Sequence, residues 1–343
     1  MKNIEGLVRD NIKNLKPYSS ARDEYAGSKG IFLDANENPF GKLNRYPDPH
    51  HRKLREELSA YYSIAPESIF VGNGSDEAID LLFRIFCNPG KDQALTFTPT
   101  YGMYEVSAAV NDVKMITIPL DENFDIQPSA IKPFLKNDKL KLIFLCSPNN
   151  PTSNSFSREK IIEVLKMFSG IVIVDEAYID FSMGKSLADE LKEFNNLAIL
   201  RTFSKSWGAA AIRVGMVYSS PEIVSLLYKV KPPYNVSLPD QKAALKRISN
   251  AGKYRKQVSA ILRERERLAD RLSSLPIVKT VYNSDANFLL VKVTDPDRIY
   301  EYLTSRKVIV RNRNSVVPGC IRITVGKRKE NERLIRELKQ III

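Results

Sequence analysis

Residues 201–215 read RTFSKSWGAAAIRVG, and the rest of the chain is organised around this stretch. Its single lysine, Lys205, lies among small and hydroxyl residues between two apolar runs, 197–200 and 214–218. The pattern predicts a lysine held at the end of a strand. Partial burial and a neighbouring cation, for which Arg213 is a candidate, would lower the pKa of its amine and allow it to form a Schiff base. The alternative is a surface lysine, one of 52 lysines and arginines.

An order of apolar strand, polar turn and amphipathic helix recurs along the first part of the chain. Strands are predicted by the apolar runs 68–71, 94–97, 140–146, 171–174 and 197–200. Polar residues follow them at 72–77, 98–104, 147–152, 175–178 and 201–208. Because open α/β sheets bind ligands beyond the carboxyl ends of their strands, we expect an α/β fold with a mostly parallel sheet and a ligand site at that edge.

The length of 343 residues allows two domains. We expect an N-terminal arm at 1–30, a large ligand-binding α/β domain at 31–235 and a smaller α+β domain at 236–343. Ile31–Leu33 is predicted to be a short strand, and the prolines within Arg45–Pro49 predict a rigid turn.

The net charge of +12 allows an anionic partner. The excess is spread over helical stretches such as 253–271 and 327–339, where it alternates with glutamate and apolar residues. Solvated helix faces are the preferred explanation, so no nucleic-acid partner is expected. A basic nucleic-acid-binding protein is the alternative from another class.

No apolar run approaches the roughly 18 residues of a membrane span, and the N-terminus lacks a signal-peptide pattern. A cytoplasmic location without a membrane partner is therefore expected. Cys87, Cys146 and Cys320 are scattered, and the two histidines, His50 and His51, are adjacent. This spacing disfavours a metal site and nucleophilic catalysis by a Ser-His or Cys-His pair.

Asp175 follows the β-branched run 171–174, which predicts a carboxylate at a buried strand end. Such a charge requires a partner. A magnesium-binding aspartate of an ATPase is one alternative, but the phosphate loop is missing, since Ile179 stands where a first glycine should precede Gly184-Lys185-Ser186. A protonated pyridine nitrogen would suit this carboxylate.

Gly72-Asn73-Gly74, with Ser75 opening a helix, predicts a nest of backbone N–H groups suited to a phosphate. An ordinary helix cap by Ser75 is the alternative explanation. Ser204 and Arg213 could complete the shell of a dianion. A Schiff-base lysine, a carboxylate for a pyridinium and a phosphate cradle, each after a separate strand, together describe pyridoxal 5'-phosphate.

The order and spacing of several motifs indicate a known family. The chain resembles the pyridoxal-phosphate-dependent aminotransferases of fold type I, and among them the histidinol-phosphate aminotransferases, along nearly its whole length. The motifs that carry the resemblance are PYSSAR (17–22), DANENP (34–39), RYPDP (45–49), GNGSDE (72–77), SPNNPT (147–152), VDEAY (174–178), TFSK (202–205) and GCIRITVG (319–326).

The resemblance implies a role for each matching residue around the cofactor. Lys205 would hold it covalently and, once freed, move the substrate proton. Asp175 would keep the ring nitrogen protonated, Asn150 and Tyr178 would hydrogen-bond the ring oxygen, and Tyr101 would stack on the ring. The phosphate group would be held by Gly74, Ser75, Asp76, Ser204 and Arg213, with Tyr46 reaching in from a partner subunit.

For the substrate, the resemblance implies recognition of an acidic end by Arg322, with Arg311 and Tyr18 nearby and Asn150 as a further contact. The implied enzyme is a homodimer with shared active sites that converts L-histidinol phosphate and 2-oxoglutarate to imidazole acetol phosphate and L-glutamate, in histidine biosynthesis. A broad or aromatic amino-acid aminotransferase, or a decarboxylase of a phosphorylated amino acid, is the alternative on the same fold.

One position departs from the family pattern. Ser153 stands where most relatives have glycine after Asn150-Pro151-Thr152. A side chain with a Cβ must be accommodated in a turn that usually exploits glycine, so we expect a locally altered turn without loss of activity.

Overall fold

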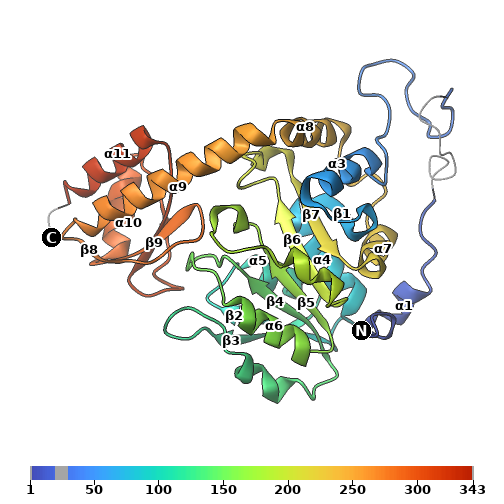
Figure 1. Cartoon of the computed structure of the whole chain (residues 1–343), viewed down its shortest axis with the longest axis horizontal. Helices are drawn as coiled ribbons and strands as arrows, with labels where there is room; N and C mark the ends of the chain where they lie inside the picture. Colours follow the sequence, from blue (N-terminus) through green and yellow to red (C-terminus); the bar gives the residue numbers. More distant parts are fainter. Residues whose placement is uncertain (1, 20–29, 342–343) are drawn as a thin grey trace.

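The computed structural model describes residues 2–19 and 30–341. Residues 20–22 of the first family motif and a large part of the predicted N-terminal arm lie outside the described residues. Figure 1 shows two lobes, each with its own sheet, and the long helix α9 (Ala251–Ser273) runs from one lobe to the other. The predicted division at residue 235 stays a prediction, and the two sheets lie on opposite sides of it.

The larger lobe is built on a seven-stranded sheet in the order β1-β7-β6-β5-β4-β2-β3. Its strands are β1 (Ile69–Asn73), β2 (Gln93–Thr98), β3 (Lys114–Pro119), β4 (Leu140–Cys146), β5 (Ile171–Asp175), β6 (Leu197–Thr202) and β7 (Val214–Ser219). Strands β2 to β6 run parallel, whereas β7 runs antiparallel to both of its neighbours. The predicted α/β fold with a mostly parallel sheet is confirmed.

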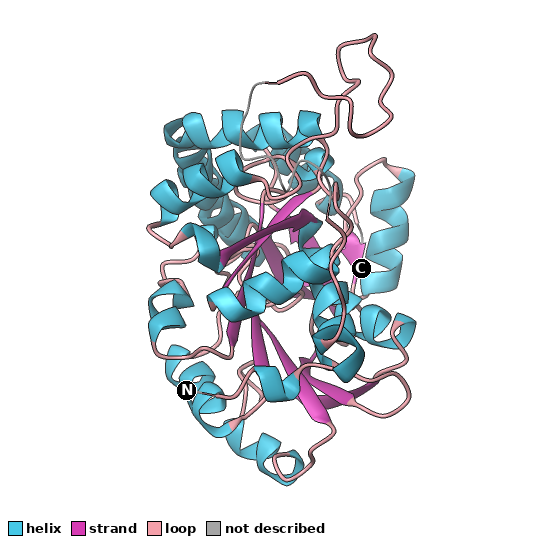
Figure 2. Cartoon of the chain, turned by 90° about the vertical axis from the view of Figure 1, so that its right-hand side faces the viewer, coloured by secondary structure: helices cyan, strands magenta, loops and turns pink. Residues whose placement is uncertain are grey.

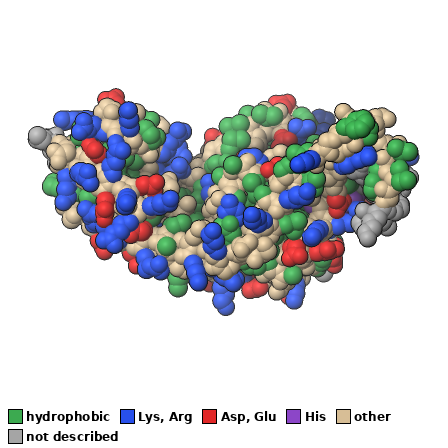
Figure 3. Space-filling view, turned by 90° about the horizontal axis from the view of Figure 1, so that it is seen from above, with side chains coloured by type: hydrophobic (Ala, Val, Ile, Leu, Met, Phe, Trp, Pro, Cys, Tyr) green, Lys and Arg blue, Asp and Glu red, His purple; other side chains and the backbone are tan. Residues whose placement is uncertain are grey.

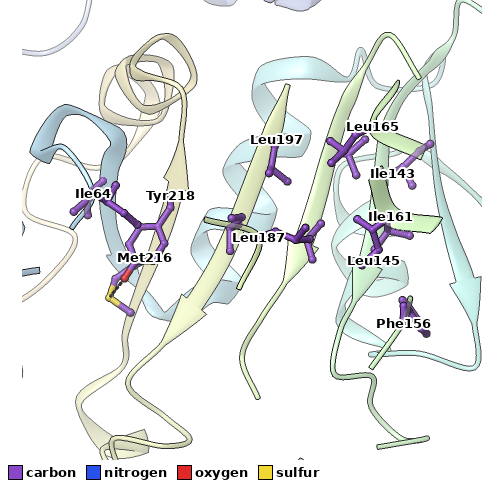
Figure 4. Close-up of a cluster of buried hydrophobic side chains, with 14 of the residues drawn as sticks. Ile64, Ile143, Leu145, Phe156, Ile161, Leu165, Leu187, Leu197, Met216 and Tyr218 are labelled. Atoms are coloured by element: carbon purple, nitrogen blue, oxygen red, sulfur yellow. Dashed lines mark hydrogen bonds between the residues drawn. The ribbon is translucent and has the colours of Figure 1, made fainter. Parts of the chain in front are cut away.

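Helices cover both faces of this sheet, as Figure 2 shows. The helices of the larger lobe are α1 (Asp10–Lys13), α3 (Arg52–Tyr62), α4 (Gly74–Phe86), α5 (Met103–Val110), α6 (Arg158–Met167), α7 (Pro221–Val230) and α8 (Leu238–Ser249). Strands buried on both faces must be apolar at every position. In β5, for example, Val172 and Val174 face one hydrophobic cluster while Ile171 and Ile173 face the other. Part of the first cluster is drawn in Figure 4.

The smaller lobe is an antiparallel sheet in the order β10-β11-β9-β8. Its elements are β8 (Val278–Val281), β9 (Phe288–Val293), α10 (Pro296–Ser305), β10 (Arg311–Asn312), β11 (Cys320–Thr324) and α11 (Arg328–Leu338). One sheet face, with Leu289, Val291, Ile321 and Ile323, packs on α9, α10 and α11 in one hydrophobic cluster. The opposite face carries Phe288 and Leu290, which pack in two smaller clusters that include Tyr178 and Phe124 of the larger lobe.

The predicted strand at Ile31–Leu33 is wrong. These residues form no strand, and the side chains of Ile31 and Leu33 are 92% and 90% exposed. An apolar run becomes a strand when a neighbouring strand pairs with it and buries one of its faces. Within the described part of the chain, no such partner accompanies this segment.

The basic side chains are distributed over the surface and do not form one patch on the face that Figure 3 shows. Figure 3 shows lysine and arginine side chains spread over both lobes and interleaved with acidic ones on the face in view. None of the described helices is long and apolar enough to cross a membrane.

Candidate active site

The parallel strands bring the predicted polar turns to one edge of the large sheet. Cys146 and Asp175, the last residues of β4 and β5, are register partners, and β6 ends beside them at Thr202. The turns after β4, β5 and β6 thus meet α4 and the segment 210–213 around a cavity of about 150 Å³. Nine predicted site residues line it: Ser75, Asp76, Tyr101, Asn150, Asp175, Tyr178, Ser204, Lys205 and Arg213.

Lys205 lies in this cavity with its Nζ 5.2 Å from the ring centre of Tyr178. Burial lowers the pKa of Lys205, the carboxylate of Asp175 opposes that shift, and the guanidinium of Arg322 adds to it. The predicted cation beside the lysine was Arg213, but the cation that depresses the pKa is Arg322. Arg213 is instead engaged by Ser204 and Asp76, on the other side of the cavity.

The carboxylate of Asp175 is buried at the end of β5, with 3% exposure. Its Oδ2 accepts a hydrogen bond of 2.8 Å from the Tyr104 hydroxyl, and its Oδ1 accepts one of 3.0 Å from the Ala177 N–H. Burial raises the pKa of Asp175, and these two hydrogen bonds oppose the rise. Asp175 forms no ion pair with any described residue. A buried carboxylate held by two neutral donors fits a cationic ring nitrogen.

Tyr104 was missed by the sequence analysis. It lies on α5, fully buried, with its ring stacked on Phe144 at 4.9 Å and edge-on to Tyr101 at 5.5 Å. A tyrosine among apolar residues of a helix usually packs in the hydrophobic core, so the sequence pattern does not indicate a functional hydroxyl. The available signal is the spacing of Tyr101 and Tyr104, which is about one helical turn.

The predicted phosphate cradle is assembled at the start of α4. Gly74 has a φ of 73°, and its N–H donates to the Arg213 carbonyl at 2.8 Å. A Cβ at Gly74 would lie 2.6 Å from the Arg213 guanidinium, and one at Gly215 would lie 2.3 Å from the Gly74 backbone. Only glycines allow this close approach. The first N–H groups of α4 therefore face the cavity beside an arginine.

Arg213 is held in the cradle by two side chains. Its Nη1 donates to the Ser204 hydroxyl at 3.3 Å, and its Nη2 donates to the Asp76 carboxylate at 3.2 Å. Asp76 also accepts a 3.2 Å hydrogen bond from the Tyr101 hydroxyl. Backbone donors and a fixed guanidinium at a helix N-terminus form an arrangement suited to a phosphate dianion.

On the other side of the cavity, the small lobe contributes Arg322. Its guanidinium donates to the Asn150 side-chain oxygen and lies 5.2 Å from the ring centre of Phe288. Arg311 is its register partner on β10 and is exposed. Asn150 and Tyr178 are both buried, at 5% and 7% exposure, and burial raises the pKa of Tyr178. The structure thus brings both predicted substrate arginines to the same side.

Two predicted site residues lie away from the cavity. Tyr18 is 72% exposed and lines a separate hollow with His50 and Tyr228. Tyr46 stacks on Tyr234, with ring centres 4.3 Å apart, in another hollow. The physical reason is connectivity, because the segments bearing both tyrosines run along the surface of the lobe and not along the sheet edge. Neither residue joins the site formed by its own chain.

The turn after Asn150 keeps a glycine-type backbone in spite of its serine. Ser153 has a φ of 70° and is fully buried. Its hydroxyl donates to the backbone carbonyls of Thr152 and Asn283, at 2.5 and 3.1 Å. These bonds offset the cost of placing a Cβ in the left-handed region. Ser153 thus adopts the left-handed backbone that favours glycine and adds a hydrogen bond to Asn283 of the small lobe, and the altered turn stays a prediction.

The fold and the site define an aminotransferase. The chain belongs to the family described as aminotransferase class I and II, whose sequence pattern matches residues 25–338. It is 51% identical, over 343 residues, to the histidinol-phosphate aminotransferase of Cytophaga hutchinsonii, with 98% of each chain covered. It is 50% identical, over 344 residues, to that of Parabacteroides distasonis, with 99% of each covered.

A solved structure shows the same arrangement. The histidinol-phosphate aminotransferase from Clostridium acetobutylicum superposes with a TM-score of 0.79 at 26% identity, over 87% of this chain and 90% of that chain.

Proposed function

We propose that this chain is a pyridoxal-phosphate-dependent aminotransferase that interconverts L-histidinol phosphate and 2-oxoglutarate with imidazole acetol phosphate and L-glutamate, in histidine biosynthesis. The observation that carries the proposal is the presence in one cavity of a desolvated lysine, Lys205, and a buried aspartate, Asp175, that forms no ion pair with any described residue. The sequence identity of 51% and 50% to two histidinol-phosphate aminotransferases supports the choice of substrate.

The residues of the cavity fit the cofactor. Lys205 would bond to it covalently, Asp175 would face its ring nitrogen, and Tyr101 would lie against its ring. Asn150 and Tyr178 would hydrogen-bond its ring oxygen. Its phosphate would sit against the backbone N–H groups of the 74–76 turn at the start of α4, with Ser75, Ser204 and Arg213 around it. When bound, the cofactor supplies an electron sink for the electron pair left on the substrate carbon.

The chain's own residues then handle the proton and the substrate's charge. Burial and Arg322 lower the pKa of Lys205, which favours its neutral form, so the amine would accept the proton from the substrate carbon and return it to the cofactor side. Arg322 and Arg311 would bind the anionic end of the substrate, which is a phosphate in one half-reaction and a carboxylate in the other.

We further propose a homodimer in which Tyr46 enters the partner's site. The segment that carries it exposes large apolar side chains, namely Ile31, Leu33, Phe40 and Leu43, at 68% or more. Exposed apolar side chains gathered on one segment are typical of an interface. The hollow around Tyr46 lies apart from the site of its own chain, which favours a role in another.

The proposed location is the cytoplasm. Cys87, Cys146 and Cys320 are all buried free thiols, which supports a reducing compartment.

The test is an absorbance spectrum of the purified protein before and after addition of L-histidinol phosphate without any keto acid. A yellow band that collapses to the amine form of the cofactor, and returns with 2-oxoglutarate, is the expected result. If only aromatic amino acids convert the band, the enzyme belongs to the same family but acts on aromatic amino acids instead of L-histidinol phosphate. Release of carbon dioxide from a phosphorylated amino acid would favour the decarboxylase, and a protein that stays colourless with pyridoxal phosphate would overturn the cofactor.

A further inference from the structure

Arg313 follows directly on strand β10 and lies on the same sheet face as the two substrate arginines. Its N–H donates to the Cys320 carbonyl at 3.0 Å, which extends the pairing of β10 with β11 by one step beyond Asn312. Side chains alternate along a strand, and directly opposed residues share a face. Because Arg311 opposes Arg322, the three guanidinium groups of Arg311, Arg313 and Arg322 start from one face of the sheet.

This face is opposite to the one on which α9, α10 and α11 form their shared hydrophobic cluster, which contains Ile321 and Ile323. It is directed to the large lobe, because its Phe288 packs with Tyr178 and Phe181. On this face, Arg322 reaches Asn150 of the large lobe. Tyr178, which lines the cavity, acts electrostatically on both Arg313 and Arg322. Arg313 is therefore directed to the substrate side of the cavity.

The three arginines carry charge that no carboxylate of the described residues neutralises. None of them forms an ion pair there, and Arg322 donates to a neutral amide. The Nε of Arg313 is buried and has no hydrogen-bond partner in the described part of the chain. The nearby carboxylate of Asp297 accepts from Asn312 and Asn314, at 2.6 and 2.8 Å, and so supports the turn and not the arginine.

A buried arginine elsewhere in the fold shows the contrast. Arg201, 5% exposed, forms ion pairs with both Glu176 and Asp180. Burial alone lowers its pKa, yet Tyr62 and these two carboxylates raise it overall. For Arg313, burial lowers the pKa and the like charges of Arg322 and Arg311 lower it further. The fold thus neutralises its structural arginine and leaves Arg311, Arg313 and Arg322 without a counter-ion among the described residues.

We propose that Arg313 is a specificity-determining residue that, with Arg311 and Arg322, selects a phosphate monoester over a carboxylate at the far end of the substrate. This inference rests on the proposed function. A phosphate monoester offers three acceptor oxygens and a charge of about −1.5 to −2 near neutral pH, whereas a carboxylate offers two oxygens and one charge. Two guanidinium groups satisfy a carboxylate, so a third contributes mainly to the dianion.

The test compares the two half-reactions of the holoenzyme in Arg313→Gln, Arg313→Lys and the control Arg336→Gln. Arg336 is exposed on α11, so its variant removes the same charge away from the site. In Arg313→Gln, the apparent dissociation constant for L-histidinol phosphate should rise roughly 10-fold to 100-fold, the loss of one charge-assisted hydrogen bond. The value for L-glutamate should change less than about 3-fold, with similar maximal rates for both substrates.

Arg313→Lys should recover part of the loss, and Arg336→Gln should behave like the unaltered enzyme. Equal weakening for both substrates, or no weakening for either, would overturn the role of Arg313. A second measurement separates this inference from the proposed function: inhibition of the L-glutamate half-reaction by inorganic phosphate. If the unaltered enzyme does not react with L-histidinol phosphate, the proposed substrate is wrong. In that case, weaker inhibition by phosphate in Arg313→Gln but not in Arg336→Gln would still support a phosphate contact by Arg313, and unchanged inhibition would contradict it.

Discussion

The two sides of the cavity hold their polar groups in opposite ways. On the large-lobe side, Asp175, Arg213 and Ser204 are each fixed by a hydrogen bond from or to another side chain. On the small-lobe side, Arg311 and Arg313 have no carboxylate partner among the described residues, and Arg322 has an amide. One side is preorganised by the chain, and the other is left for an anion to complete.

This difference corresponds to the two kinds of ligand in transamination: the cofactor is the same in both half-reactions, whereas the substrate changes. A cofactor that stays bound through every turnover benefits from groups whose positions the fold already fixes. Two successive substrates with different acidic ends require cations that can serve both. Four predictions test whether the two sides are separable in this way.

The largest effect is expected for Lys205→Ala. Loss of the amine removes both covalent attachment and proton transfer, so the rate should fall by at least about 10³-fold. Single-turnover spectra with L-histidinol phosphate measure it, and Lys136→Ala, at an exposed lysine, is the control. A variant that keeps more than a tenth of the activity would remove Lys205 from the centre of the site.

Asp175→Asn should lower the rate by about 10² to 10³-fold, as for loss of a preorganised charge. In the cofactor-free protein, the folded state holds the Asp175 proton more tightly than the unfolded state, whose carboxyl has an ordinary pKa of 3.8. The stability of the unaltered protein should therefore fall as the pH rises above about 4 through the raised pKa of Asp175, and the asparagine variant should lack this decline. Thermal melting over a pH series measures the difference, and identical profiles would contradict it.

Arg322→Gln tests the substrate side. The affinity for both L-histidinol phosphate and L-glutamate should fall about 10² -fold, because a bidentate charged contact is lost from each. Cofactor affinity, measured by fluorescence titration of the cofactor-free protein, should change less than about 3-fold. A parallel loss of cofactor affinity would show that the two sides are not separable.

The smallest effect is expected for Tyr104→Phe. Loss of one hydrogen bond to Asp175 should weaken cofactor binding by about 10-fold and raise the pKa of that carboxyl further, so the loss should be greatest at low pH. Titrations at several pH values measure it, with Tyr300→Phe on α10 as the control. Unaltered affinity at every pH would leave Tyr104 with a packing role only.

The sequence indicated the fold through its apolar runs. The β4 run was placed at its observed bounds, and the runs at β5 and β6 were extended by only one or two residues in the structure. Buried parallel strands give such continuous apolar stretches, so they are visible without any tertiary information. Ile31–Leu33 has the same local composition, but no strand of the described residues pairs with it, and a local pattern cannot show whether a strand will pair.

The residues after those runs also determined the cofactor side, because parallel strands end at one edge and must bring their turns together. Lys205, Asp175 and Arg213 could be chosen in this way from the sequence alone. Only the tertiary structure revealed Tyr104 beneath Asp175, Arg322 as the cation that acts on Lys205, and Arg313 on the same sheet face as the two substrate arginines. The first two interactions join residues 71 and 117 positions apart, and their energies depend on burial and distance, which the order of residues along the chain does not contain.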